Sequence, residues 1–368
     1  MRFPEFSGEW KMCTIGELIT KVGSGVTPRG GEAVYKTEGH PFVRSQNVGL
    51  GNLLLDDIAF IDEETHLRQK NTELQFNDVL LNITGASIGR SALVDKQIVG
   101  GNVNQHVCII RTKENLVPSF ICSFLLSNYG QRQIDSFQAG GNRQGLNFEQ
   151  IKSIKITIPS KDEQIKIAKL LRAIDERIAT QNKIIEKLQS LIKGIAQNIV
   201  SNNKPNIRLS DCLDCSSSTL QESDVCETGI YPVYGANGIV GYLDNYNTEG
   251  EAVYIIKDGS GVGTVSYATG KCSATGTLNT LQAKDGYSLQ YLYYILKVFN
   301  FEPYKTGMAI PHIYFKDYGK AKIFCPSYTE QLRYARLQSA IDSKLSVEKN
   351  ILTSLSSQKQ YLLRQMFI

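Results

Sequence analysis

The apolar positions from residue 161 onward recur in alternating steps of four and three. Such steps average 3.5 residues and place the side chains on one stripe of an α-helix, as in a coiled coil. The stretch to residue 200 contains no Pro and a single Gly, Gly194, so it predicts one helix of about 40 residues, roughly 60 Å long. The predicted seam positions are Ile167, Leu171, Ile174, Ile178, Ile185, Leu188, Ile192 and Ile195.

The same pattern returns near the end of the chain. SKDEQIKIAKLLRAID at 160–175 matches SYTEQLRYARLQSAID at 327–342 without a gap, an offset of 167 positions. A repeat of this length and number excludes a solenoid, which stacks many units of 20 to 50 residues. The second seam is predicted at Ile341, Leu345, Leu352, Leu355 and Leu362, with Gln181 and Glu348 as its matching polar positions.

Both copies begin with the same helix-start signal. Ser160 precedes Glu163 by three positions, and Ser327 precedes Glu330 by three. This spacing is typical of a capping box, in which the Ser oxygen and the Glu carboxylate accept from backbone N–H groups of the first turn. We therefore expect helices that begin near 161 and 328.

Two long helices with matching length and phase predict an antiparallel pair that buries both apolar stripes. The alternative is that each helix lies independently on its own domain. Loop-like SNNKPN at 201–206 ends the first helix and leads into the second large segment. The expected organisation is a globular domain (1–158), a helix (159–204), a second globular domain (205–325) and a second helix (326–368).

The two large segments resemble each other. DVLLNITGASIGRSALVD at 78–95 and EAVYIIKDGSGVGTVSYA at 251–268 share the order of an apolar run, a Gly-rich turn and another strand-like run. A helix-like stretch and a Gly-containing loop follow in both. The expected fold is therefore mixed, α+β or α/β, with two similar globular domains, two long helices and an internal pseudo-two-fold repeat.

Composition favours a globular protein outside the membrane. The chain has 368 residues with 42% hydrophobic and 21% charged residues, and no apolar run approaches the length of a membrane span. MRFPEFSGEWKM lacks the features of a secretory signal, so a cytoplasmic protein is expected. The net charge is only +4 and its excess lies in the repeated helical segments, so nucleic-acid binding by the large segments would need local patches.

The eight cysteines are too sparse for a disulfide scaffold, and most stand in apolar runs. Cys212 and Cys215 have the spacing of a metal-ligand pair, and only Cys226 and Cys272 could complete a tetrahedron. This pattern is weak, and the sequence does not decide whether the pair binds a metal.

Motifs of catalysis are missing. GASIGRS and ATGKCS lack the spacing of a phosphate-binding loop, and GSGVG lacks the helix and third Gly of a dinucleotide fingerprint. Pro-Pro, expected beside Asn or Asp in an amino-methyltransferase, occurs nowhere. We therefore expect a chain without catalytic activity of its own.

RFPEFSGEW at the start, ITGASIG between strands, and two divergent segments that each lead through P-x-x-x-E-Q into a long helix resemble the specificity subunit of type I restriction-modification systems. The resemblance covers essentially the whole chain. It implies two target recognition domains, each reading one half of a bipartite, asymmetric DNA sequence. It also implies that the helices form a spacer that docks two methyltransferase subunits, and that restriction subunits, which translocate and cleave DNA, join the assembly.

The resemblance implies no cofactor in this chain, with S-adenosylmethionine, ATP and Mg expected in the partner subunits. The partners expected are double-stranded DNA and these subunits, and no membrane. The alternative, from another class, is a coiled-coil adaptor whose two domains bind protein or carbohydrate.

Candidate DNA contacts are the polar and basic residues of loop-like clusters, because Arg and Lys suit guanine, Asn and Gln suit adenine, and hydroxyls and cations bind phosphate. A polar turn between strands has the same composition, so that reading stays open for each cluster. The candidates of the first domain are Arg44, Gln46, Asn47, Thr84, Ser87, Arg90, Asn104, Gln105, Asn142, Arg143 and Gln144. Those of the second domain are Asn237, Lys257, Ser260, Asn279, Thr280, Lys305 and Thr306.

Overall fold

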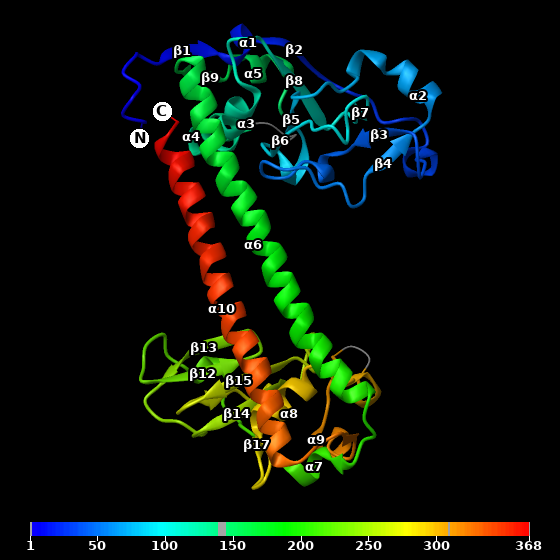
Figure 1. Cartoon of the computed structure of the whole chain (residues 1–368), viewed down its shortest axis with the longest axis vertical. Helices are drawn as coiled ribbons and strands as arrows, with labels where there is room; N and C mark the ends of the chain where they lie inside the picture. The colour runs from blue at the N-terminus through cyan, green and yellow to red at the C-terminus, as the bar shows by residue number, and fades with distance from the viewer. Residues whose placement is uncertain (1, 139–144, 308–309, 368) are drawn as a thin grey trace. The chain divides into compact units, whose positions relative to one another are not determined.

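The chain forms two compact units in the computed structural model, which describes residues 2–138, 145–307 and 310–367 (Figure 1). The first unit comprises residues 1–181 and 351–368, and the second comprises residues 182–350. Each unit therefore contains one globular domain together with a part of both long helices. The boundary between the units crosses both long helices, so neither helical segment forms a compact unit of its own.

The first unit contains a four-stranded antiparallel sheet of order β2-β8-β5-β6 and a three-stranded sheet of order β4-β3-β7, in which β3 and β7 are parallel. A short ribbon pairs β1 with β9. The strands are β1 (Lys11–Thr14), β2 (Ile19–Ser24), β3 (His40–Val43), β4 (Ala59–Ile61), β5 (Val79–Asn82), β6 (Ser91–Leu93), β7 (Asn102–Val103), β8 (Val107–Thr112) and β9 (Lys155–Ile158). The helices of its globular part are α1 (Ile15–Leu18), α2 (Glu63–Arg68), α3 (Pro118–Leu126), α4 (Asn128–Ser136) and α5 (Phe148–Ser153).

The second unit repeats this topology with different side chains. Its four-stranded sheet has the order β11-β17-β14-β15, its three-stranded sheet the order β13-β12-β16 with β12 and β16 parallel, and its ribbon pairs β10 with β18. The strands are β10 (Ile207–Arg208), β11 (Leu213–Ser217), β12 (Tyr231–Gly235), β13 (Gly238–Leu243), β14 (Glu251–Ile256), β15 (Val265–Thr269), β16 (Ser273–Ala274), β17 (Leu278–Ala283) and β18 (Lys322–Ile323). The helices are α7 (Leu209–Cys212), α8 (Leu289–Leu296) and α9 (Phe315–Tyr318). The predicted duplication of the chain is confirmed strand by strand.

The central strands are apolar on both faces because their sheet lies between two layers. On β5, Val79 and Leu81 point into the core shared with α3, and Leu80 points into the core shared with the three-stranded sheet. Successive side chains of a strand face opposite sides, so the run VLLN serves two cores at once. In the second unit, Tyr254 of β14 packs in a core that also contains Ala274 of β16.

The two long helices are α6 (Lys161–Ser201) and α10 (Tyr328–Gln365), and they begin where the sequence predicts. Both predicted Ser residues stand before the first turn, but the Glu residues act differently. Glu330 accepts from the backbone N–H of Ser327 (3.3 Å), as in a capping box. Glu163 is fully buried and instead accepts two hydrogen bonds from Arg2, at 2.8 and 2.7 Å. At the first helix Ser160 Oγ accepts from the backbone N–H of Glu163 (3.4 Å), as predicted, but the Glu163 carboxylate binds a cation of the N-terminal segment, so only half of the predicted box is confirmed.

The helices pack against each other within each unit, in antiparallel order (Figure 1). In the first unit, Leu171 of α6 and Leu363 of α10 share one core, and Lys359 forms an ion pair with Asp175 (2.5 Å). In the second unit, Gln338 of α10 donates to the backbone carbonyl of Ile192 on α6 (3.2 Å). The alternative of independent helices is therefore wrong.

The predicted seam agrees with the burial of the side chains. Gln181 and Glu348, the polar positions of the pattern, are both buried. Leu188 and Ile195 are half-buried, which is expected toward the edge of the stripe. Fully buried seam positions are Ile167, Leu171, Ile174, Ile185, Ile192, Leu345, Leu355 and Leu362, and Ile178, Ile341 and Leu352 are half-buried. In the described part of the chain, no helix is both long enough and apolar enough to cross a membrane.

The two starting Glu residues give a test of the difference between the repeats. Glu163→Ala removes a buried carboxylate and leaves Arg2 without its bidentate partner, whereas Glu330→Ala removes one exposed cap. We expect Glu163→Ala to lower the urea midpoint of unfolding clearly more than Glu330→Ala, whose cost should be about 1 kcal/mol or less. Equal midpoints for the two variants would contradict a structural role of the Arg2–Glu163 pair.

Candidate nucleic-acid interface

Loops that are far apart in the sequence meet where β5 ends in the first domain. The backbone N–H of Ile83 donates to the carbonyl of His106 (3.0 Å), and the N–H of Leu146 donates to the carbonyl of Ile83 (2.8 Å). Thr84 also forms an antiparallel bridge with Gly145. The loops that follow β5, precede β8 and precede α5 therefore share one corner of the domain.

Polar side chains line this place, which we call the β5 corner and define by Thr27, Thr84, Gln105 and His106. Gln105 Oε1 accepts from the backbone N–H of Thr27 (2.9 Å), and the hydroxyl of Thr84 hydrogen-bonds to Nδ1 of His106. Gln105 is exposed, and Thr84 and His106 are half-buried. The corner presents amide, imidazole and hydroxyl groups, which are the groups that contact bases and phosphates.

The loop around Arg44 lies beside this corner because Asn82, the last residue of β5, links the two. Asn82 Nδ2 donates to the backbone carbonyl of Ser45 (2.8 Å) and to the hydroxyl of Ser87 (3.0 Å). Arg44 donates to the carbonyl of Asp57 (2.7 Å). Gln46 and Arg90 are exposed, and the side-chain amide of Gln46 donates to Oδ2 of Asp57.

The second domain repeats the construction at the end of β14. The backbone N–H of Lys257 donates to the carbonyl of Thr277 (3.0 Å), and the N–H of Ile313 donates to the carbonyl of Lys257 (2.9 Å). Asp258 forms an antiparallel bridge with His312. Lys257 therefore occupies the place of Ile83 in the first domain, and Asp258 the place of Thr84.

The side chains of this second place, the β14 corner defined by Lys257, Asp258, Thr306 and His312, differ from those of the first. Asp258 Oδ1 and His312 Nδ1 are 2.6 Å apart. Thr306 is exposed and Lys257 is half-buried. The two corners thus share a backbone frame and present different hydrogen-bonding groups, as expected for two binding sites with different targets.

A family model described as the type I restriction modification DNA specificity domain matches residues 7–190 and 205–357. The chain belongs to the type I restriction-modification specificity subunits. Each matched segment contains one globular domain, so the specificity subunit has two target recognition domains. The alternative of a coiled-coil adaptor has no support in this match.

Relatives and solved structures agree with the family. A putative type I specificity subunit from Mycoplasma genitalium is 25% identical over 320 residues, which are 79% of this chain and 81% of that protein. The EcoKI specificity subunit of Escherichia coli K12 is 22% identical over 203 residues, 52% of this chain and 41% of that protein.

The fold is shared with two solved structures. A crystal structure of the S subunit from M. genitalium has a TM-score of 0.68 at 19% identity, and covers 100% of this chain and 99% of that one. A chain from a study of complex assembly and conformational transition in the type I R-M system has a TM-score of 0.56 at 16% identity, covering 98% and 97%. At these identities the likeness concerns the fold alone.

Several predicted DNA contacts of the specificity subunit have side chains that are buried inside its domains. Asn47 is fully buried and donates to the carbonyl of Leu54 (2.9 Å). Asn279 is bonded to Ser217 and Tyr318, within the second domain. The buried candidates are Asn47, Asn104, Asn279 and Thr280.

Other predicted contacts keep their standing as predictions. Asn237 is exposed in the turn between β12 and β13, and Ser260 is exposed after β14. Lys305 is half-buried and pairs with Glu302 (2.6 Å). Asn142, Arg143 and Gln144 lie outside the described residues.

Sequence reasoning missed Asp258 and His312. Both occur in stretches that the sequence marks as Gly-containing loops, KDGSG and YKTGMAIPHIYF. Their pairing depends on a bridge between residues 54 positions apart, which no local pattern reports.

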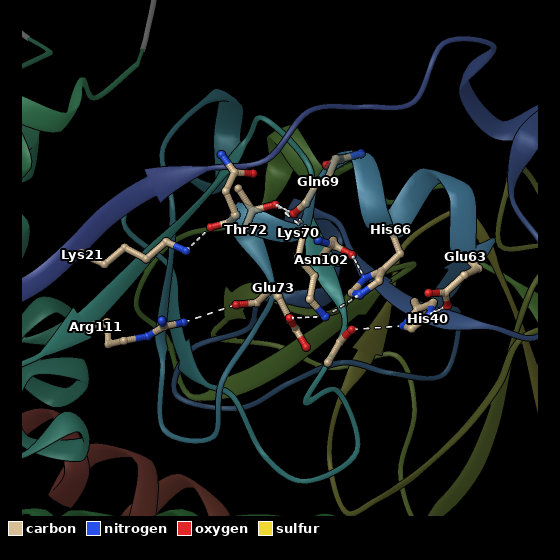
Figure 2. Close-up of polar contacts among 12 residues, drawn as sticks. Lys21, His40, Glu63, His66, Gln69, Lys70, Thr72, Glu73, Asn102 and Arg111 are labelled. Carbon is tan, nitrogen blue, oxygen red and sulfur yellow. Dashed lines mark hydrogen bonds and ion pairs between the residues drawn. The ribbon is translucent and has the colours of Figure 1, made fainter.

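A second missed cluster, shown in Figure 2, surrounds two stacked histidines in the first domain. The rings of His40 and His66 are parallel, with centroids 3.8 Å apart. His66 is buried, and its Nδ1 lies 2.7 Å from Oδ1 of Asn102, whose Nδ2 donates to the carbonyl of Gln69 (2.9 Å). Since the Asn102 amide is oriented by Gln69, His66 Nδ1 carries the proton and donates.

Charged groups complete this cluster. Lys70 Nζ lies 3.4 Å from Nε2 of His66 and forms an ion pair with Glu73 (2.7 Å). Glu63 is 2.6 Å from His40, and the hydrogen bond from His40 holds the pKa of the Glu63 carboxyl below its ordinary value. The cluster joins α2 to β3 and β7 and satisfies buried polar groups, which assigns it to the fold of the domain rather than to DNA.

The cysteine pair of the second domain is directed into the protein. Cys212 is buried, and its Sγ donates to the carbonyl of Leu209 (3.3 Å). Burial raises the pKa of the Cys212 thiol to about 12 and that of Cys215 to about 11, which disfavours the thiolate that metals bind. Among residues 2–138, 145–307 and 310–367, no group of three or more His, Cys, Asp or Glu side chains is placed to hold a metal ion.

Asn47 and its exposed neighbour Gln46 form a matched pair for testing the division between interior and surface residues. Asn47→Ala removes hydrogen bonds to Leu54 and Asp57 and should lower the free energy of unfolding by about 2 kcal/mol. Gln46→Ala removes only an exposed hydrogen bond to the Asp57 carboxylate and should lower it clearly less, by about 0.5 kcal/mol. Thermal unfolding of both variants checks the prediction, and equal stabilities would contradict it.

Proposed function

We propose that the specificity subunit binds double-stranded DNA, with the β5 corner and the β14 corner each reading one half of a bipartite target. The observation that carries this proposal is the equivalence of the two corners: the same backbone hydrogen bonds frame both, while the side chains differ. Equal frames place the contacts alike on two stretches of duplex. Different side chains make the two half-sites different, so the target is asymmetric.

The helices α6 and α10 set the number of base pairs between the half-sites. A helix without Pro is stiff over this length, and 41 residues at 1.5 Å per residue extend about 60 Å. Pairing along the seam stiffens both helices further. Readers connected by such a rod impose a fixed separation on their target, as two-fold DNA-binding dimers do.

Two copies of a methyltransferase subunit dock on the helices, one in each unit. Support comes from two grooves that are related by the internal repeat. Asp175 in the first groove and Asp342 in the second are 167 positions apart. Lys359 in the first groove and Ile192 in the second are separated by the same 167 positions. The first groove is lined by Cys122, Ser123 and Leu126 of α3, Asp175 of α6, and Lys359 and Leu363 of α10. The second is lined by Tyr293 and Tyr294 of α8, Lys297 directly after it, Asp342 of α10, and Ile192 and Ala196 of α6.

The chemistry of the system belongs to the partners. The sequence has no Pro-Pro for an amino-methyltransferase motif and no phosphate-binding loop. We infer a subunit without catalytic activity that positions a methyltransferase using S-adenosylmethionine and recruits restriction subunits that use ATP and Mg.

The spacing role predicts the result of a paired deletion. Removing residues 178–184 from α6 and 345–351 from α10 takes out one heptad from each helix and keeps the seam in phase. The helices shorten by about 10 Å, so the gap between the half-sites should fall by about three base pairs. Mapping methylated bases in cells that contain the methyltransferase subunit, with the wild-type chain, the deletion or no chain, measures this.

Three outcomes of that mapping are informative. Unchanged half-sites with a shorter gap support both the domains as readers and the helices as spacer. Altered half-sites would contradict the separation of the two roles. Methylation at the same positions without the chain would contradict the proposal that it directs the methyltransferase to DNA.

Docking of a methyltransferase in the first groove predicts a change in stoichiometry. Ser123→Trp places a large side chain in that groove and should leave complexes with one methyltransferase subunit where the wild type carries two. Ser136→Trp, at the exposed end of α4, is the matched control and should keep two. Native mass spectrometry of the co-purified complex counts the subunits, and two subunits on the Ser123→Trp chain would exclude this groove.

A further inference from the structure

The Asp258–His312 pair lies at the surface of the β14 corner on a hydrogen-bonded backbone frame. Gly259 N–H donates to the carbonyl of Pro311 (3.0 Å), and His312 exchanges two backbone hydrogen bonds with Thr306, at 2.8 and 2.9 Å. Both side chains of the pair are 36% exposed. The frame therefore fixes the two backbones while the carboxylate and the imidazole remain accessible from outside.

The carboxylate determines which nitrogen of the imidazole faces outward. Nδ1 of His312 lies 2.6 Å from Oδ1 of Asp258, so Nδ1 carries a proton and donates. Among the described residues, Nε2 of His312 has no hydrogen-bond partner. In the neutral ring, Nε2 is then an acceptor, and the second carboxylate oxygen of Asp258 is another acceptor of the pair.

The first domain places a histidine at the equivalent corner by a different route. His106 hydrogen-bonds to Thr84, the residue equivalent to Asp258, but it comes from the position that Thr277 occupies in the second domain. His312 comes from the position of Gly145. Two of the four histidines of the chain, His106 and His312, thus lie at equivalent corners but come from different segments. The partner of His106 is a hydroxyl, and the partner of His312 is a carboxylate.

We propose that Asp258 and His312 together read a base edge in the half-site of the second domain, by accepting from the exocyclic amino group of an adenine or a cytosine. This rests on the proposed function and names a specificity-determining pair for it. Amino groups on major-groove base edges require acceptors, and carboxylates are known to serve cytosine in this way. The negative charge of Asp258 repels phosphate, so the partner is a base and not the backbone.

Two isosteres of histidine separate the two nitrogens. The amide of His312→Asn stands near the position of Nδ1, so it keeps a donor for Asp258 and removes the Nε2 acceptor. The amide of His312→Gln reaches near the position of Nε2, so it restores an acceptor there. Asp258→Ala removes the second acceptor and the group that orients the ring.

The experiment selects sequences from a random duplex library with the complex of this chain and its methyltransferase subunit. The wild type should yield a bipartite motif. His312→Asn and Asp258→Ala should lose the preference at one position of one half-site, and His312→Gln should regain part of it. Gln105→Ala, in the β5 corner, is the control and should affect only the other half-site.

A second measurement tests the amino group itself. Each adenine or cytosine of the selected half-site is replaced, one at a time, by purine or 2-pyrimidinone, which lack the exocyclic amino group. One replacement should weaken wild-type binding about tenfold, the size of one specific base contact, and should not weaken His312→Asn binding further. Thermal midpoints of all variants show whether they are folded at the assay temperature.

The results distinguish this pair from the wider function. A wild-type complex that enriches no sequence would refute the proposed function, and this pair with it. A bipartite wild-type motif that is unchanged in folded His312→Asn and Asp258→Ala would refute only the role of the pair. Loss of affinity for all sequences without a change of preference would indicate a phosphate contact and would likewise overturn it.

Discussion

Each long helix is attached to its domain by one buried glutamine, and the rest of the structure depends on this attachment. Gln164 Oε1 accepts from the backbone N–H of Val117 at the start of α3, and Gln331 Oε1 accepts from the N–H of Ser288 at the start of α8, both at 2.9 Å. Their amide nitrogens donate to the carbonyls of Pro159 (3.1 Å) and Pro326 (2.9 Å). A buried amide is costly unless it is satisfied, so the geometry of this joint is strongly constrained. It explains why Glu-Gln recurs at a constant offset in both repeats.

The joint also accounts for the two similar grooves. Because Gln164 and Gln331 align α3 with α6 and α8 with α10 in the same way, equivalent positions line the space beside each helix. The side chains there have diverged. Asp175 pairs with Lys359 in the first unit, whereas Asp342 accepts from the hydroxyl of Tyr294 (3.3 Å) in the second. The backbone frame is therefore conserved between the halves of the chain where the chemistry is not.

The sequence predicted the helices and the duplication well, because these depend on local spacing. The seam from Ile167 to Leu362, the helix starts and the repeat of the domains all follow from periodicities that a single strand or helix imposes on its own residues. The site was predicted less well. Most of the polar stretches were identified correctly as places where the chain turns, but Asn279 and Thr280 lie in strand β17. Asn47 and Asn279 have the same residue type as surface readers and lie in the interior. Composition does not tell an amide that satisfies a neighbouring carbonyl from one that faces solvent.

The sequence by itself determined that this chain contains two similar domains and two long helices. Hydrophobic periodicity and capping residues act within one segment, so they are visible in the sequence. Only the tertiary structure decided that Glu163 meets Arg2, that His66 meets Asn102 and Lys70, and that Asp258 meets His312. Each of these contacts joins segments whose approach is set by sheet pairing and helix packing. Such a contact depends on two residues that are far apart in the sequence, so no local sequence pattern predicts it.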